Sequence, residues 1–321
     1  MKYGAAWDEV NANPEGFAVS AKPRFGRYEI QQLLGRGGMA EVYKARVLEG
    51  ARAGEMVALK RLTPRLTNDP EAVDLFCGEA DVSGMLKHPH IVEVFEAGVV
   101  GEVYYLAMEY VDGRDLALIL ARCRERRIFL PINFAVHIGL AALDALAYAH
   151  AARGPTGIPL HIVHCDVSPS NLFVSRLGEI KLGDFGIAKV RAHGEAHDQA
   201  VWGKLAYLAP EQLRQTPPSP LVDLWGAAAI LYECLTNQRV VRGSNEEMME
   251  ALREGHIVGI ESHRPEVPPG LSDVVHKGLE MDPALRWQTA DQFAAALRPY
   301  HDEISGGALG IASVVRGLFK S

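Results

Sequence analysis

The stretch at residues 162–186, IVHCDVSPSNLFVSRLGEIKLGDFG, constrains the fold of this chain more than any other segment. Two short apolar runs flank a turn-like Arg-Leu-Gly, and this alternation predicts a small β-hairpin. Because a hairpin of this length brings its two ends together, we expect Asp166, Asn171 and Asp184 to converge. Asn171 and Asp184 offer hard oxygen ligands that suit Mg²⁺. Asp166 remains as a carboxylate able to accept a hydroxyl proton.

A glycine-rich stretch near the N-terminus, LLGRGGMAEVYKARV, predicts two strands joined by a turn. Glycines in such a turn let backbone N–H groups approach phosphate oxygens. Lys60 follows in the apolar run VALK, and Glu79 lies on the apolar face of a helix expected over residues 71–86. Taken singly, the turn could be a plain tight turn and Lys60 a surface lysine with a buried stem.

Together these motifs resemble those of protein kinases: a glycine loop, VALK, HxDxxxxN and Asp-Phe-Gly, in this order. The pattern is most similar to the bacterial serine/threonine protein kinases of the eukaryotic type, over residues 25–300. This agreement disfavours a solvated loop with an incidental Asp-Phe-Gly. The resemblance implies an α+β, bilobal fold. An N-lobe at about 25–111 holds a small antiparallel sheet with one helix, and a larger, mainly helical C-lobe spans about 112–300.

The resemblance also implies roles in phosphoryl transfer from ATP with Mg²⁺ to a Ser or Thr of a protein substrate. Asp166 corresponds to the base, while Lys60 contacts the α- and β-phosphates and pairs with Glu79. Asn171 and Asp184 correspond to the metal ligands. Serine/threonine is preferred over tyrosine because the loop lacks the Ala-Ala-Arg pattern of tyrosine kinases after Asp166.

The same resemblance places the nucleotide between the lobes. Met108 guards the back of the adenine pocket, the backbone of residues 109–111 faces the adenine edge, and Asp115 lies near the ribose. The full set of expected ATP-binding residues is Leu34, Gly35, Arg36, Gly37, Gly38, Met39, Ala40, Val42, Ala58, Lys60, Met108, Glu109, Val111, Asp115 and Phe173. Outside the site, Asp223 is expected to brace the catalytic loop, and Glu211 and Arg286 to form a structural ion pair.

Four positions depart from the family pattern. Ala40 replaces the third loop glycine, which predicts somewhat weaker closure over the phosphates. Cys165 stands where most members carry an arginine before the base. Ser168 and Lys204 stand where the family carries a lysine and a threonine, respectively. Since this exchange keeps one hydroxyl and one cation beside Asp166, we expect Ser168 and Lys204 to act together in catalysis.

The segment at residues 184–211 contains neither Ser nor Thr, and Tyr207 is its only hydroxyl. The arginine that would bind a phosphate there is Cys165 in this chain. Both halves of a phosphate switch are missing, so we expect activity without activation-loop phosphorylation. The alternative from another functional class is a pseudokinase that binds nucleotide and signals as a scaffold. A small-molecule phosphotransferase is disfavoured by APEQ and by the Asp223 helix.

The composition adds limits on partners and compartment. The net charge is −7 and no block of Lys and Arg stands out, so the sequence gives no sign of a basic surface that would bind nucleic acid. Four cysteines without a CxxC pair argue against disulfides or structural zinc, which fits a cytoplasmic location. No stretch is judged long and apolar enough to cross a bilayer.

Two segments flank the expected kinase body. Residues 1–24 are expected to form a flexible arm, because they hold few large apolar side chains. Residues 301–321 are expected to carry an amphipathic helix. Docking of this helix on the large lobe is favoured, and a partner-binding or weakly membrane-seeking helix is the alternative.

Overall fold

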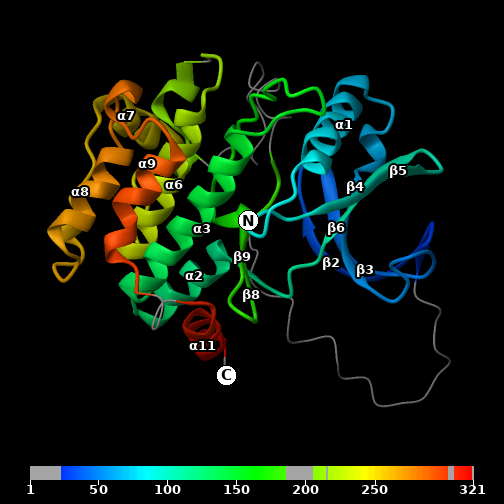
Figure 1. Ribbon diagram of the computed structural model, residues 1–321, viewed down its shortest axis with the longest axis horizontal. Helices are drawn as coiled ribbons and strands as arrows, with labels where there is room; N and C mark the ends of the chain where they lie inside the picture. Colours follow the sequence, from blue (N-terminus) through cyan, green and yellow to red (C-terminus); the bar gives the residue numbers. More distant parts are fainter. Residues whose placement is uncertain (1–22, 186–204, 215, 303–306, 320–321) are drawn as a thin grey trace.

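The computed structural model describes residues 23–185, 205–214, 216–302 and 307–319, and these residues form two lobes (Figure 1). The smaller lobe is a six-stranded antiparallel sheet with one α-helix on it, and the larger lobe is mainly helical. The expected α+β, bilobal architecture is therefore confirmed. The predicted arm lies outside the described residues, apart from Pro23 and Arg24.

The sheet of the small lobe has the strand order β1-β2-β3-β4-β6-β5, and every neighbouring pair is antiparallel. The strands are β1 (Arg24–Phe25), β2 (Tyr28–Arg36), β3 (Ala40–Val47), β4 (Met56–Leu62), β5 (Val94–Val100) and β6 (Val103–Glu109). Side chains alternate between its two faces. Leu62 and Leu106 pack with Phe76 of the helix α1 (Pro70–Met85) on one face, while Tyr28 and Val47 form an apolar cluster on the other.

Helix α1 corresponds to the helix expected over residues 71–86, and its local sequence explains where it begins. The side chain of Asp69 accepts hydrogen bonds from the backbone N–H groups of Glu71 and Ala72, and Pro70 occupies the first turn, where its missing N–H is not needed. The buried face includes Phe76 and Glu79. The carboxylate of Glu79 therefore lies between α1 and the sheet.

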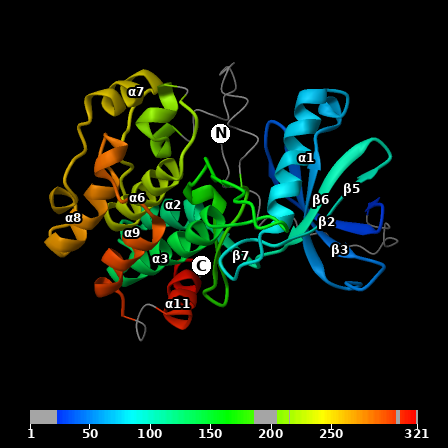
Figure 2. The ribbon, with the colours of Figure 1, turned by 45° about the horizontal axis from the view of Figure 1, so that its top comes forward.

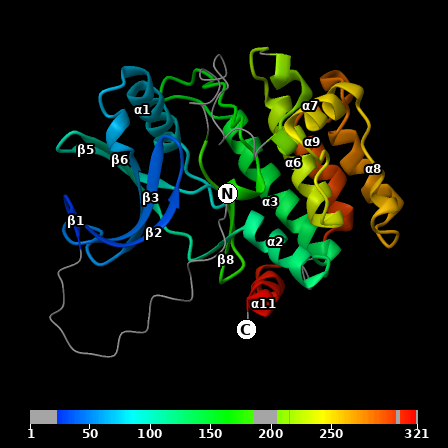
Figure 3. The same ribbon diagram turned by 180° about the vertical axis from the view of Figure 1, so that it is seen from behind.

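The large lobe is built around α6 (Pro220–Thr236), whose residues from 222 to 236 are all buried. The other helices are α2 (Leu116–Arg126), α3 (Ile132–His150), α7 (Asn245–Glu254), α8 (Pro269–Gly278), α9 (Ala290–Leu297) and α11 (Ala308–Leu318). Figure 3 shows α2, α3, α6 and α9 side by side in this lobe. The expected ion pair of Glu211 and Arg286 is confirmed: two contacts of 2.7 Å join the guanidinium to both carboxylate oxygens.

Helix α3 corrects one expectation. The helix has 19 residues and holds an 18-residue window with a mean hydropathy of 1.5, so it is long and apolar enough to cross a membrane by length and composition. The expectation that no stretch reaches this limit was wrong. Since 61% of the apolar window is buried inside the protein against neighbours such as α6, α3 also has the character of a core helix.

A second sheet joins the lobes. It consists of β7 (Gly113–Asp115), β8 (Leu172–Ser175) and β9 (Ile180–Leu182), all antiparallel. Figure 1 labels β8 and β9, and Figure 2 labels β7. Strands β8 and β9 form the predicted hairpin, with Leu172 opposite Leu182. At Gly113 a Cβ would lie 1.9 Å from the carbonyl oxygen of Val174, so only glycine lets β7 pair this closely.

Candidate active site

Lys60 lies on the face of β4 that α1 covers, opposite Val42 of β3 and Leu106 of β6. Its Nζ is 2.5 Å from the Oε1 atom of Glu79 and 3.0 Å from the Oδ1 atom of Asp184. Burial alone would lower the Lys60 pKa, but the carboxylates of Asp184 and Glu79 outweigh it and raise the pKa above its usual range. The predicted Lys60–Glu79 pair is confirmed, and Lys60 is a fixed cation.

Asp166 and Asn171 meet at the start of the hairpin, as expected. The Nδ2 group of Asn171 donates to the backbone oxygen of Asp166 at 2.8 Å and to its Oδ2 atom at 2.9 Å. At the other end of the hairpin, the N–H of Gly183 donates to the carbonyl of Asn171 at 2.9 Å. Asn171 and Gly183, the residue before Asp184, are thus held together by a backbone hydrogen bond.

Asp223 braces the loop that carries Asp166, which confirms its expected role. From the first turn of α6, its buried carboxylate accepts the backbone N–H groups of His164 and Cys165, both at 2.8 Å. His150 of α3 adds a third contact, with Nε2 2.8 Å from Oδ2. Charged hydrogen bonds of this kind are strong, so the loop position is set by the core of the large lobe.

His164 is a functional contact that the sequence reading missed. Its Nδ1 atom lies 3.2 Å from the backbone N–H of Asp166 and must accept, so Nε2 carries the proton and donates to the carbonyl of Gly183 at 3.1 Å. The buried ring also packs on Phe185, with the centroids 4.6 Å apart. The neutral imidazole therefore ties the Asp166 loop to the backbone before Asp184.

The donor set fits a hard divalent cation such as Mg²⁺. Because the Nδ2 group of Asn171 donates to Asp166, the amide oxygen is the atom of that side chain suited to a metal. Asp184 supplies a carboxylate from a left-handed backbone conformation, φ 57°, which is uncommon outside glycine. Within the described ranges no three His, Cys, Asp or Glu side chains form a metal site. Two protein oxygens leave ligand positions for phosphates and water, as Mg²⁺ prefers.

The glycine turn lies between β2 and β3 and is braced from the segment after β4. The N–H of Gly37 donates to the carbonyl of Ala40 at 2.8 Å, and the guanidinium of Arg65 donates to the carbonyl of Gly38 at 3.0 Å. Leu34 is the extra residue of a β-bulge, since Leu33 and Gly35 pair with consecutive residues of β3. Gly35 and Arg36 still belong to β2, so the turn itself is residues 37–39.

Other residues expected to contact the nucleotide lie opposite one another on neighbouring strands. Ala58 of β4 pairs with Met108 of β6, and Asp115 of β7 pairs with Phe173 of β8. The Oδ1 atom of Asp115 accepts the N–H of Leu118 at 2.8 Å, so this carboxylate also caps α2. Burial raises the Asp115 pKa. At the end of β6, the Oε2 atom of Glu109 lies 3.0 Å from the Nζ atom of Lys181 on β9.

Of the two exchanged positions, Ser168 and Lys204, the structure describes only Ser168. Ser168 is buried, and its hydroxyl lies 3.0 Å from that of Ser170. Lys204 lies outside the described residues, as do residues 186–203 of the activation segment. The pairing of Ser168 with Lys204 therefore stays a prediction.

At the end of the activation segment, Tyr207 is held in a network that the sequence reading missed. Its hydroxyl donates to the Oε2 atom of Glu233 at 2.5 Å, and Arg124 of α2 contacts Oε1 at 2.8 Å. Burial and the nearby carboxylate raise the Tyr207 pKa. Cys165 carries a thiol whose pKa is raised by burial and by Asp223, so it stays uncharged.

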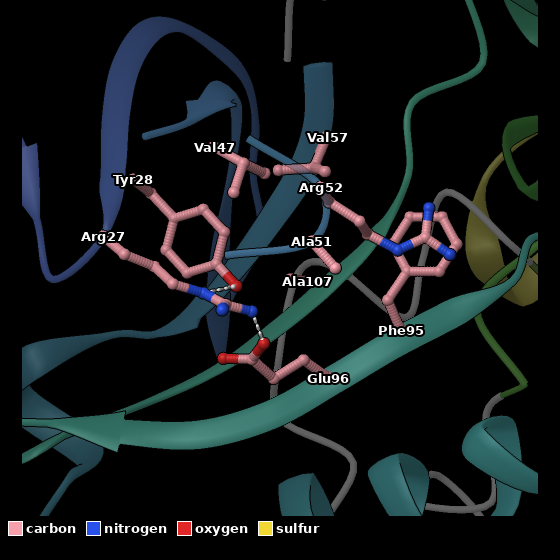
Figure 4. A pocket seen from close by; sticks show the side chains of 9 residues that line it. All are labelled: Arg27, Tyr28, Val47, Ala51, Arg52, Val57, Phe95, Glu96 and Ala107. Atoms are coloured by element: carbon pink, nitrogen blue, oxygen red, sulfur yellow. Dashed lines mark hydrogen bonds and ion pairs between the residues drawn. The ribbon is translucent and has the colours of Figure 1, made fainter. Parts of the chain in front are cut away.

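A separate cavity of about 190 Å³ lies on the sheet face away from α1, among Tyr28, Phe95 and two arginines (Figure 4). Figure 4 shows Arg27 pointing to Glu96, with which it forms an ion pair. Arg52 pairs with Glu55 at 2.9 Å. The arginines of this cavity are thus paired within the protein, whereas Lys60 meets two carboxylates at the boundary between the lobes. We therefore assign the candidate active site to the residues around Lys60.

Comparisons with known proteins agree with this geometry. The family model described as "Protein kinase domain" matches residues 28–296. The chain is 34% identical to the tyrosine-protein kinase MasK of Myxococcus xanthus over 92% of its own length and 46% of the relative's. It is 31% identical to the serine/threonine-protein kinase PrkC of Bacillus subtilis, over 86% of this chain and 41% of that protein. It thus spans less than half the length of these two relatives.

Solved structures give the same result. The kinase domain of PknI from Mycobacterium tuberculosis superposes with a TM-score of 0.64 at 27% identity. The superposition covers 88% of this chain and 99% of that structure.

Proposed function

This chain belongs to the protein kinase domain family, because the family model matches residues 28–296, and from this premise we propose that it phosphorylates proteins on Ser or Thr with ATP. The observation that carries the proposal is the contact of Lys60 with both Glu79 and Asp184. The residue before Asp184 is bonded in turn to Asn171, which contacts Asp166. A pseudokinase scaffold does not need all five groups in this arrangement.

The proposed reaction assigns one task to each group. Lys60, fixed by Glu79, binds the α- and β-phosphates. Asp166 orients the acceptor hydroxyl and accepts its proton as that oxygen bonds to the γ-phosphorus and the bond to ADP breaks. Mg²⁺, when bound by Asp184 and Asn171, supplies charge neutralisation at the phosphates. His164 holds the Asp166 loop and the backbone before Asp184 in register.

The test is phosphate transfer from radiolabelled ATP to a generic protein substrate. Lys60→Met, Asp166→Asn and Asp184→Asn should each lower kcat/KM by about 10²-fold or more, the scale of single electrostatic or proton-transfer contributions. Lys87→Met, at an exposed lysine on the same lobe, is the matched control and should leave kcat/KM unchanged. Full turnover in all three site variants would rule out the proposed mechanism.

The acceptor residue needs its own measurement, because one similar relative is named a tyrosine kinase and others are named serine/threonine kinases. We favour Ser/Thr, since the loop after Asp166 reads VSPSN rather than the tyrosine-kinase pattern. Phosphoamino-acid analysis of a substrate that offers all three hydroxyls should find phosphoserine or phosphothreonine. Phosphotyrosine alone would assign the tyrosine acceptor instead.

We also propose activity without activation-loop phosphorylation. Tyr207 is the only hydroxyl of residues 184–211, and its contact with Glu233 and raised pKa disfavour modification. The uncharged thiol of Cys165 cannot bind a phosphate. Phosphatase-treated protein should therefore keep most of its activity toward an added substrate. A phosphate on Tyr207 that activity requires, found by mass spectrometry, would contradict this prediction.

A further inference from the structure

Helix α11 is docked on the large lobe next to the β8–β9 hairpin. Figures 1 and 3 show it in red against the base of α2. Ile311, Ala312, Val315 and Leu318 are buried, and Ile311, Val315 and Leu318 belong to the main core. Ser313 and Arg316 lie on the exposed side. The apolar stripe of the C-terminal helix is therefore covered by this chain itself.

Both ends of α11 make specific polar or close contacts. At its C-terminal end, Arg122 and Arg126 of α2 donate to the carbonyls of Leu318 and Gly317, at 3.3 and 3.1 Å. Cations at this end of a helix match its dipole and satisfy carbonyls that have no partner within the helix. At the N-terminal end, a Cβ on Gly178 of the hairpin turn would lie 1.8 Å from the carbonyl oxygen of Ala308.

A third contact joins Phe319, the residue that follows α11, to strand β7. The guanidinium of Arg114 on β7 lies 5.4 Å from the ring centroid of Phe319, within cation–π range. β7 has only three residues, and its last one, Asp115, both pairs with Phe173 and caps α2. α11 thus contacts all three elements that meet there: β7, α2 and the hairpin turn.

We propose that α11 is a positioning element for nucleotide binding, with Arg114 as its link to the cleft. A three-residue strand cannot hold its own geometry, so the junction of β7 and α2 is set by what packs behind it. Release of α11 would free this junction and misplace Asp115 and Phe173. The inference rests on the proposed ATP site in the cleft. It predicts an effect on nucleotide affinity, with little effect on the transfer step, because Lys60 and Asp166 are held from other elements.

The first test places a charge in the interface of α11. Val315→Asp puts a carboxylate at a buried position, and Ser313→Asp puts the same charge on the exposed side of the same helix as the matched control. Val315→Asp should raise both the ATP KM and the Kd of a fluorescent ADP analogue about tenfold and leave kcat within about threefold. Ser313→Asp should match the wild type.

The second test changes the hairpin turn and leaves α11 itself intact. Gly178→Ala introduces the clash with Ala308 at a left-handed position, φ 86°. Gly157→Ala introduces the same backbone cost at φ 80° with nothing within 4 Å. Of these two variants, only Gly178→Ala should raise the Kd of the fluorescent ADP analogue and increase amide hydrogen exchange over residues 113–126 and 308–318.

The outcomes separate the inference from the proposed function. Increased exchange over residues 308–318 with an unchanged Kd would overturn the inference alone, because the helix would then be a purely structural appendage. Protection of α11 that survives both Val315→Asp and Gly178→Ala would also overturn it. A wild-type protein that binds no nucleotide would overturn the proposed function, and the inference with it.

Discussion

Ser168 occupies a buried position two residues after Asp166, where the kinase family carries a lysine, and its hydroxyl contacts Ser170. If Lys204 supplies the missing cation, the two positions act as one unit. Lys204→Ala should then cost roughly 2–4 kcal/mol of transition-state stabilisation, the range for one preorganised charge contact. Ser168→Lys alone should also lower the rate, because two ammonium groups would share one space.

The double change Ser168→Lys with Lys204→Thr should recover much of the rate. A double-mutant cycle on kcat/KM measures the coupling between the two positions. Lys181→Ala is not a suitable control, because that side chain is mostly buried and contacts Glu109 at 3.0 Å. Lys87→Ala is suitable, because that side chain is 75% exposed and lies 3.9 Å from Glu93. Additive effects in the cycle would show that Ser168 and Lys204 act separately.

At the scale of elements, local sequence patterns predicted the strands and helices whose formation depends on neighbouring residues. The β8–β9 hairpin follows from the alternation and glycine turn around residues 172–182, and Glu79 was placed by helical spacing. The network of Tyr207, Glu233 and Arg124 joins segments that lie 26 and 109 positions apart, and no local pattern reports such a contact. β7 was missed because three residues are too few to show a period.

A contact between His137 and His301 joins α3 to the segment before α11, and its contribution to stability can be tested at acidic pH. The Nδ1 atom of His137 lies 3.0 Å from the Nε2 atom of His301, and burial, His301 and His90 together lower the His137 pKa to about 4. The folded state therefore binds fewer protons than the unfolded state between about pH 6.5 and pH 4. The free energy of unfolding should fall as the pH drops through this window, by at most about 1.4 kcal/mol per pH unit for this proton.

Thermal unfolding of the wild type and of His137→Gln at pH 7.5 and pH 5 measures this contribution. The variant retains a hydrogen-bonding side chain but cannot titrate, so its Tm should fall less between the two pH values. Equal losses of Tm in both proteins would assign the acid sensitivity to other groups, such as His276, whose pKa is also lowered by burial.

At the scale of the whole molecule, the order of motifs predicted the two lobes, because each motif belongs to one known place in the kinase fold. Nucleotide binding between the lobes should also stabilise the folded protein. A ligand that binds only the folded state stabilises it by about 2.7 kcal/mol at a hundred times its Kd. ATP with Mg²⁺ at that excess should raise the Tm by about 5 °C.

The control for this measurement is Lys60→Met, which removes the cation at the phosphates and should abolish the shift. Removal of Mg²⁺ with EDTA should reduce it in the wild type. A shift that is independent of both would place nucleotide binding outside the cleft described by Lys60, Asn171 and Asp184.

Among the residues that the structure describes, two lysine–carboxylate pairs cross the boundary between the lobes. Lys60 of β4 contacts Asp184, and Lys181 of β9 contacts Glu109 at the end of β6. A rotation of the lobes about residues 109–111, where the chain passes from one lobe to the other, would keep the second pair and pull the first apart. Opening the lobes therefore separates Lys60 from Asp184, whose side chain is 40% exposed to solvent, so the angle between the lobes should respond to ionic strength, as a binding equilibrium between opposite charges does.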